Sequence, residues 1–213
     1  MITLKEKAYN IIKENIITCK YAPGELLNET HLMEEVGASR TPIREALSKL
    51  EQEKLVKIFS KKGIMVSELS IKEIGDVYQV RLMLEPQMIR QFGAGLPVEK
   101  MEECRNILMS YKPEMTVAEK NYLDDSLHRL IIDNCPNNYF NEWMTLIYSQ
   151  NQRLRIITGQ LNHRMERNTD EHKEIVEAML RGDFDGAAEL MEEHLEQGRQ
   201  STFDYFLQNG AGK

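Results

Sequence analysis

The feature of this sequence that most constrains its fold is a pair of short helical segments joined by a glycine turn. Asn28 is a good N-cap for the first segment. The apolar residues of that segment recur at helical spacing: Leu32, Met33 and Val36. Gly37 then stands where helices commonly end in a left-handed backbone conformation, and Pro42 lies in the first turn of a second helix ending near Glu53. The spacing predicts a helix-turn-helix with the start of its second helix at the surface.

The segments on either side complete a small domain. Apolar residues at helical spacing predict another helix over residues 4–18. β-Branched and aromatic residues predict a strand over residues 55–59, and a turn leads from it to a returning strand over residues 64–66. Three helices followed by a hairpin are typical of a winged helix-turn-helix. We therefore expect a DNA-binding domain over residues 1–68.

From residue 69 onward the sequence pattern is helical throughout. Glycine and proline residues break it into segments, at Gly93, Pro97, Pro136 and Gly182 among others. We predict six helices. They cover residues 71–92 and 97–111, a third segment that follows Pro113 and runs to residue 134, a fourth that follows Asn137-Asn138 and runs to residue 157, and residues 168–180 and 184–207. Helices joined by such short turns favour an antiparallel bundle. The predicted fold class is mainly α, with an N-terminal winged helix-turn-helix and a C-terminal all-α antiparallel helical bundle over residues 69–213.

Charge and cysteine content bear on what the chain can bind and where it works. Residues 1–68 contain 11 Lys or Arg against 10 Asp or Glu, a net charge of +1, while the remaining residues contain 16 against 24, a net charge of −8. A near-neutral head can still bind DNA if its basic groups cluster on one face. Three widely spaced cysteines, a charged N-terminal segment and the lack of a membrane-length apolar run predict a cytoplasmic protein with reduced thiols and no membrane contact.

Two groups of residues are candidates for DNA contact. Those on the exposed first turn of the second helix of the motif are Ser39, Arg40, Thr41 and Arg44. Arginine can bond both major-groove acceptors of guanine, and Ser or Thr can bond phosphate or base edges. The tip of the wing can contact a neighbouring groove or the backbone through Lys61, Lys62 and Gly63. An isolated arginine pair would more often be a solvated charge, but here the turn, helix and basic wing occur in the order that DNA binding requires.

Histidine spacing in the bundle indicates a candidate metal site. Asp124 and His128 are four residues apart and share one face of a helix. His172 and His194 lie on the two helices of a predicted hairpin, and reflection through its turn puts them at one level. One carboxylate and three imidazoles can converge on Zn²⁺, Ni²⁺, Mn²⁺ or Fe²⁺, among which imidazole does not select sharply. Spacing alone leaves two alternatives open: ordinary polar histidines, and Asp125 in place of Asp124.

The first 68 residues resemble the GntR family of transcription regulators. The matching stretches are the nine residues from Tyr21 to Glu29, the eleven from Gly37 to Leu47, and then Leu55-Val56 and Gly63. The resemblance implies that the residues facing DNA include Arg40, Thr41, Arg44 and Gly63. Thr30 is a departure, because relatives can carry arginine at this position.

The rest of the chain resembles the metal-binding FCD effector domain of the FadR-type branch of this family. The matching pieces are Val80–Glu85, Asp124-x-x-x-His128, Asn137, Glu171-His172 and Glu193-His194-Leu195. In that family the aspartate lies four residues before the histidine, which selects Asp124 over Asp125. Leu127 departs from a common phenylalanine. The count of six helices is similar to the VanR-like version of the domain.

These features together favour a regulator, most simply a repressor, that binds a palindromic operator as a homodimer, since one winged helix reads few base pairs. Four protein ligands leave up to two octahedral positions of a metal open to a small carboxylate effector. Arg81 is the candidate counter-charge, although a structural ion pair is an equal alternative for it. Two further alternatives are a metal-dependent hydrolase with an accessory DNA-binding head and a regulator with a purely structural metal. The hydrolase lacks a general base, since Glu171 and Glu193 are expected to point away from the ligands.

Overall fold

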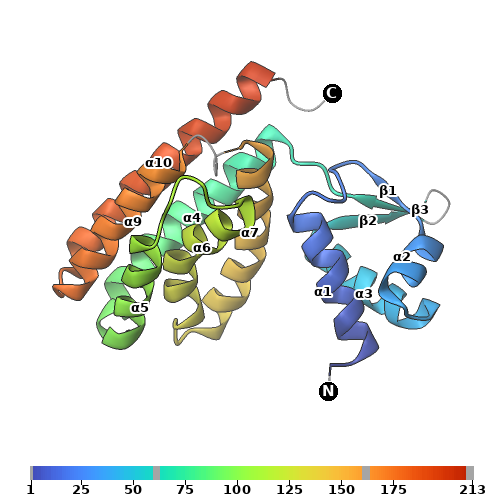
Figure 1. Cartoon of the computed structure of the whole chain (residues 1–213), viewed down its shortest axis with the longest axis horizontal. Coiled ribbons are helices and arrows are strands. Elements are labelled where there is room, and N and C mark those ends of the chain that lie inside the picture. Colours follow the sequence, from blue (N-terminus) through green and yellow to red (C-terminus); the bar gives the residue numbers. More distant parts are fainter. Residues whose placement is uncertain (1, 60–62, 160–163, 210–213) are drawn as a thin grey trace. The chain divides into compact units, whose positions relative to one another are not determined.

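The computed structural model describes residues 2–59, 63–159 and 164–209 (Figure 1). The chain divides into two compact units, Met1–Ser70 and Ile71–Lys213. The first, called the head below, combines helices with a small sheet, and the second, called the bundle, is helical. This arrangement confirms the predicted fold class. No helix in the described residues carries an apolar stretch that could cross a lipid bilayer.

The helices of the head follow the capping signals in the sequence. α1 (Leu4–Ile17) begins at a capping box formed by Thr3 and Glu6. α2 (Glu29–Val36) begins at Asn28, whose side chain accepts hydrogen bonds from two backbone N–H groups, and it ends at Gly37 in the left-handed region with φ of 68°. α3 (Arg40–Gln52) follows α2 after a turn of three residues, 37–39. The predicted helix-turn-helix is therefore present.

The sheet of the head contains one strand more than predicted. β2 (Val56–Phe59) and β3 (Gly63–Val66) pair antiparallel with Ile58 opposite Ile64, and β1 (Leu26–Leu27) pairs on the other side of β3. β1 has only two residues, too few for an alternating pattern to be recognised in the sequence. The sheet and helices enclose an apolar core that includes Ile12, Ile16, Leu32, Ile43, Leu47, Leu50, Leu55 and Val66.

The bundle contains six α-helices in its described residues, as predicted. They are α4 (Ile71–Phe92), α5 (Val98–Met109), α6 (Val117–Asp133), α7 (Asn138–Ile157), α9 (Met165–Leu180) and α10 (Phe184–Asn209), with a 3-10 turn at Gly93–Gly95. α9 begins three residues before the predicted start. α10 runs beside both α4 and α9, α6 packs on α9, and α7 packs on α4.

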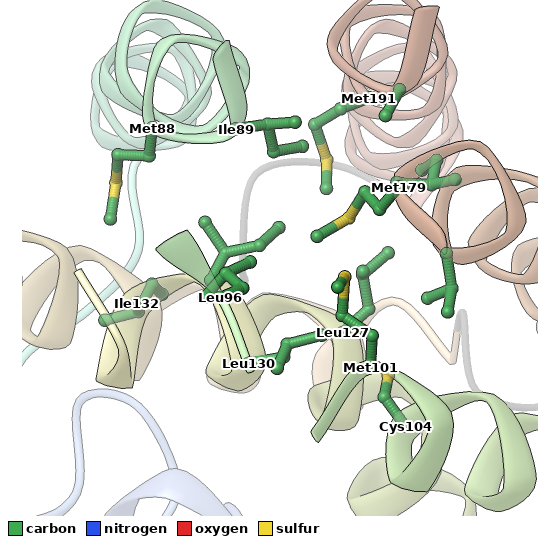
Figure 2. Close-up of a cluster of buried hydrophobic side chains, with 14 of the residues drawn as sticks. Met88, Ile89, Leu96, Met101, Cys104, Leu127, Leu130, Ile132, Met179 and Met191 are labelled. Atoms are coloured by element: carbon green, nitrogen blue, oxygen red, sulfur yellow. The ribbon is translucent and has the colours of Figure 1, made fainter. Parts of the chain in front are cut away.

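One end of this arrangement is filled with apolar, methionine-rich packing. Figure 2 shows Met101, Leu127, Met179 and Met191 directed toward one another from α5, α6, α9 and α10. Unbranched methionine side chains fill irregular gaps between helices. α6, α9 and α10, together with α4 and α7, also bury a set of charged and polar side chains, which form the candidate site described next.

Candidate DNA-reading surface and candidate metal centre

The predicted DNA-reading residues lie at the open N-terminal end of α3. Ser39, Arg40, Thr41 and Arg44 are all exposed, because the opposite face of α3 is anchored in the core of the head by four buried residues: Ile43, Ala46, Leu47 and Leu50. Ser39 is the N-cap residue, yet its side chain makes no capping hydrogen bond. The unpaired N–H groups of this helix end suit a phosphate.

A glutamate that the sequence analysis did not identify holds both arginines. Nε of Arg44 donates to Glu29 at 2.5 Å and its Nη2 at 3.2 Å, while Nε of Arg40 lies 3.5 Å from the same carboxylate. The hydrogen bond to Glu29 raises the pKa of Arg44. Glu29 is the first residue of α2, and no sequence pattern shows that it faces α3. The two guanidiniums are therefore arranged side by side before any DNA is bound.

The wing is described only in part. Gly63 is exposed and has a positive φ of 88°, a conformation that glycine adopts without strain. It lines one open cleft together with Asn28 and Arg44, so the base of the wing and the start of α3 share a face of the head. Lys61 and Lys62 lie outside the described residues, and their predicted contacts stay predictions.

Three predicted metal ligands converge inside the bundle. His128 of α6, His172 of α9 and His194 of α10 are buried, and each offers a donor nitrogen within 4.8 Å of the others. The Nε2 atoms of His172 and His194 are 3.1 Å apart. His172 and His194 thus meet across the α9–α10 hairpin, at the level that reflection through its turn predicted.

Burial keeps two of these imidazoles in the form that binds metals. The pKa of His172 lies well below its ordinary value and that of His194 is lowered to about 4, in both cases first because burial disfavours the charged ring. Neutral imidazole is the metal-binding form. Nδ1 of His172 is also buried without a hydrogen-bond partner. Two neutral imidazoles, the ring of His128 beside them and an unsatisfied nitrogen fit a divalent transition-metal ion.

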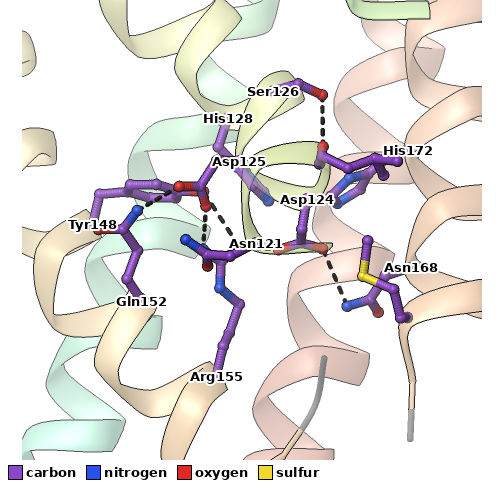
Figure 3. A network of polar contacts seen from close by, with 12 residues as sticks. Asn121, Asp124, Asp125, Ser126, His128, Tyr148, Gln152, Arg155, Asn168 and His172 are labelled. Carbon is purple, nitrogen blue, oxygen red and sulfur yellow. Dashed lines mark hydrogen bonds and ion pairs between the residues drawn. The ribbon is translucent and has the colours of Figure 1, made fainter. Parts of the chain in front are cut away.

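The predicted fourth ligand, Asp124, lies beside this triad but pairs with an arginine. One of its carboxylate oxygens accepts from Nη1 of Arg155 on α7, and the other is 3.4 Å from the amide of Asn168 (Figure 3). Arg155 also donates to Asp125, which Tyr148 holds at 2.6 Å. A metal that took Asp124 as a ligand would share this carboxylate with Arg155 or displace it.

The three-dimensional arrangement distinguishes the two neighbouring aspartates. Burial raises the pKa of Asp125 to about 6, and its oxygens accept from side chains of α7: Tyr148, Gln152 and Arg155. Asp124 instead faces Asn168 of α9, the helix that carries His172. Asp124 is therefore the better placed of the two to join the imidazoles.

Carboxylates lie behind two of the imidazoles. Glu85 of α4 is 2.6 Å from Nδ1 of His128, and Glu171 of α9 is 2.7 Å from Nδ1 of His194. Burial raises the pKa of Glu85, but Arg81 and His128 lower it by more, so it stays below its ordinary value. The expectation that Glu171 points away from the ligands is wrong, because α9 and α10 pack so closely that it reaches across to His194. Glu193 is exposed, as expected.

Arg81, the candidate counter-charge for an effector, is buried beside His128. Its Nε donates to Glu85 at 2.6 Å, and its Nη2 lies 3.4 Å from each ring nitrogen of His128. The cavity lined by Arg81, Asp124, His128 and His194 has a volume of about 10 Å³, room for one water molecule or ion. The amide of Asn151 on the same cavity is buried without a partner. A carboxylic acid does not fit this cavity with its lining side chains as they stand.

Comparison with known proteins agrees with both halves of this description. The family described as bacterial regulatory proteins, gntR family, matches residues 4–66, and the FCD domain matches residues 76–197. The HTH-type transcriptional regulator YdhC of Bacillus subtilis is 28% identical over 195 residues, which cover 87% of this chain and 85% of the relative. The HTH-type transcriptional repressor GlaR of Escherichia coli is 26% identical over 198 residues, 88% of this chain and 90% of the relative.

Solved structures show the same fold. A transcriptional regulator GntR from Rhodococcus sp. RHA1 has a TM-score of 0.83 at 18% identity, covering 94% of this chain and 97% of that one. The McbR/YncC protein of E. coli has a TM-score of 0.75 at 16% identity, covering 97% and 100%. The relatives named here are transcription regulators and not enzymes, so the alternative of a metal-dependent hydrolase finds no support.

Proposed function

The chain belongs to the GntR family of transcription regulators and carries an FCD domain. We propose that it is a repressor whose affinity for operator DNA is controlled by a small effector bound beside a metal ion. The head binds DNA, and two heads of a homodimer read a palindromic operator. The bundle holds a divalent transition metal through Asp124, His128, His172 and His194. Its six helices correspond to the VanR-like version of the domain.

The observation that carries this proposal is the convergence of three buried imidazoles from three different helices. Burying three rings and leaving Nδ1 of His172 unsatisfied costs free energy that apolar packing would avoid. A metal bound there would tie α6, α9 and α10 together, so its binding energy would add to the stability of the bundle.

In the head, Arg40 and Arg44 read base edges, and Ser39 and Thr41 bond phosphate or base edges at the start of α3. Lys61 and Lys62 add phosphate contacts that do not depend on sequence. One head reads few base pairs, so useful specificity requires two heads related by two-fold symmetry. Light scattering at working concentration tests this assembly, and a monomer that still binds one half-site tightly would contradict it.

The effector is a small carboxylate that binds beside the metal, with Arg81 as its counter-charge. Arg81 is already paired with Glu85 and the cavity is small, so effector binding must rearrange both. Such a rearrangement supplies the difference in affinity between two states that a switch requires. A tenfold release from the operator needs only about 1.4 kcal/mol of that difference.

The decisive experiment measures effector affinity by calorimetry with and without operator DNA, on metal-loaded and on stripped protein. A panel of small carboxylic acids from acetate to citrate serves as the probe. Linkage requires the operator to weaken effector binding by the same factor as the effector weakens operator binding. Equal affinity with and without DNA for every acid would contradict a switch.

The small cavity also favours a second candidate, a regulator with a purely structural metal. In that case zinc would stabilise the bundle and no small acid would change the operator affinity. Gel-shift titrations of the zinc-loaded protein with the same panel distinguish this candidate from the first.

A further inference from the structure

The buried carboxylate of Glu85 contacts a candidate metal ligand and the candidate effector-binding arginine at the same time. Its Oε2 lies 2.6 Å from Nδ1 of His128 on α6, and its Oε1 accepts from Nε of Arg81 at 2.6 Å. Glu85 is 0% exposed, so water does not compete for either contact. Arg81 is one helical turn earlier on α4, which puts both side chains on the same face.

These contacts determine which nitrogen of His128 carries the proton. Arg81 and Glu85 form a buried ion pair, and an ionised carboxylate only accepts hydrogen bonds, on both of its oxygens. Nδ1 of His128 must then donate to Glu85, which leaves the lone pair of the ring on Nε2. Nη2 of Arg81 lies 3.4 Å from both ring nitrogens of His128, so the short contact between Nδ1 and Glu85 is the one that decides the tautomer. A metal binds an imidazole through its unprotonated nitrogen.

We propose that Glu85 is a positioning residue that holds His128 in the tautomer and ring orientation for metal binding and ties this ligand to Arg81. The inference rests on the proposed function, which supplies the metal. Outer carboxylates that accept from a ligating histidine raise its basicity and orient its ring. Glu171 stands in the same relation to His194, whereas Nδ1 of His172 has no such partner.

One consequence concerns regulation of the site. One oxygen of the Glu85 carboxylate contacts the candidate metal ligand His128, and the other contacts Arg81, the candidate counter-charge of the effector. An anion that draws the Arg81 guanidinium toward itself therefore weakens the hydrogen bond between Arg81 and Glu85. The carboxylate of Glu85 is then left to its hydrogen bond with His128, which changes in strength. Glu85 therefore connects the two predicted binding functions through two direct hydrogen bonds.

The substitution Glu85→Gln tests the proposal because glutamine has the same shape but different hydrogen bonding. Arg81 only donates, so the amide oxygen of the glutamine must face Arg81, and the amide NH₂ then faces Nδ1 of His128. His128 is forced to accept there and to carry its proton on Nε2. We expect imidazole ¹⁵N spectra of the metal-free variant to show this exchanged tautomer, and calorimetry to show zinc affinity weakened by ~10- to 100-fold.

A double variant provides a rescue that a merely structural role would not give. In Arg81→Met with Glu85→Gln, no donor holds the amide oxygen, so the amide can turn and accept from Nδ1 of His128. Zinc affinity should then recover to within several-fold of the wild type, although the double variant has lost one more polar residue of the site. Zinc binding as weak as in the single variant would contradict this explanation.

Glu192→Gln is the matched control. Glu192 lies on α10 and accepts a hydrogen bond at 2.9 Å from Arg90 of α4, the helix that also carries Glu85. It removes one charge from an α4–α10 ion pair and should leave the tautomer of His128 and the zinc affinity unchanged. The wild-type spectrum decides the matter even where a variant fails to fold, because a proton on Nε2 of His128 in metal-free wild type would overturn the proposal. If the wild type binds no zinc, the proposed metal function fails. The ¹⁵N spectrum still shows whether Glu85 fixes the tautomer of His128.

Discussion

The head exposes its functional charges, and the bundle buries them. Among the described residues of the head, the buried polar side chains are only Asn15 and Ser67, and Arg40 and Arg44 project into solvent. The bundle buries a charged and imidazole set composed of Arg81, Glu85, Asp124, His128, Arg153, Arg155, His172 and His194. The difference fits the proposed ligands, because a DNA duplex binds at the surface, whereas several side chains must enclose a metal ion.

This difference predicts how function and stability are related in each unit. Exposed ion pairs contribute little to folding, so the reading arginines of the head can be changed at almost no cost in stability. Buried charges depend on one another, because removal of one partner leaves the other without compensation. In the bundle, a substitution that affects binding should therefore affect folding as well.

The largest effect is expected for Arg155→Met in metal-free protein. It leaves the buried carboxylate of Asp124 without its guanidinium, and breaking a buried pair costs about 3–5 kcal/mol of unfolding free energy. Urea denaturation measures the loss. Zinc should restore more stability to this variant than to the wild type, because the ion becomes the counter-charge of Asp124. Arg199→Met, which breaks an exposed pair on α10, is the control and should change little.

The second effect is a loss of stability of the metal-free bundle in mild acid. The folded protein holds the pKa of His194 at about 4, against 6.5 for the free side chain. The unfolded chain therefore binds the proton first, so the contribution of His194 is intact above about pH 6.5 and falls as the pH drops toward 4. Its size is on the order of 3 kcal/mol at one pKa unit per 1.36 kcal/mol.

Asp125 acts in the opposite sense, because a pKa raised to about 6 makes the folded protein the better proton binder below that pH. The measurement therefore compares urea denaturation of the wild type and of His194→Gln between pH 7 and pH 4. The difference between the two curves isolates the imidazole. A difference that does not change with pH would show that burial does not hold His194 neutral.

The third effect is stabilisation by zinc, which should be confined to the bundle. At a free concentration one hundred times its Kd, zinc adds about 2.7 kcal/mol to the free energy of unfolding. Scanning calorimetry should show a higher melting temperature for wild type and no gain for His172→Ala or His194→Ala. His31→Ala removes an exposed histidine of the head, and its zinc response should equal that of wild type.

The fourth effect separates binding from stability in the head. Arg40→Ala and Arg44→Ala should each weaken operator binding by about tenfold or more, the value of a bidentate contact to guanine. Both guanidiniums are exposed, so the melting temperatures of these variants should match the wild type. Fluorescence anisotropy with operator and scrambled DNA measures the affinities. Operator affinity equal to wild type in both variants would contradict the assignment of α3 as the reading helix.

The smallest effect is expected for Glu29→Gln, which releases both reading arginines from their shared carboxylate. The freed guanidiniums should bind any phosphate more readily, so affinity for scrambled DNA should rise and the ratio of specific to nonspecific binding should fall by a few-fold. Glu45→Gln removes the same charge from α3, where it faces Lys5 instead. An equal change in both variants would mean that net charge alone is responsible.

Local signals in the sequence determined most of the fold. Asn28 and Gly37 mark the ends of α2 through capping and a left-handed turn, which depend only on neighbouring residues. The six helices of the bundle were likewise visible from their periodicity and from the glycine and proline residues between them. β1 was missed because its two residues gain their strand conformation from pairing with β3, a partner almost forty residues away.

The candidate site was predictable only where its residues follow from helix geometry. Asp124 and His128 share a face because they are one turn apart, and His172 and His194 meet because a tight turn reflects one helix onto the next. Glu29, Glu85, Glu171 and Arg155 gave no such signal. Each is one of many charged residues on an amphipathic helix, and each contacts a side chain from another part of the chain, as Glu85 contacts His128.

The sequence by itself therefore determined the two units, their helices and the three imidazoles that meet. Only the tertiary structure decided which charge faces which across helices: Glu85 faces His128, and Arg155 faces Asp124. The physical reason is that helix formation depends on contacts three or four residues apart. The pairing of buried charges depends instead on how whole helices are rotated and packed, because each buried charge must find a partner wherever the packing places one.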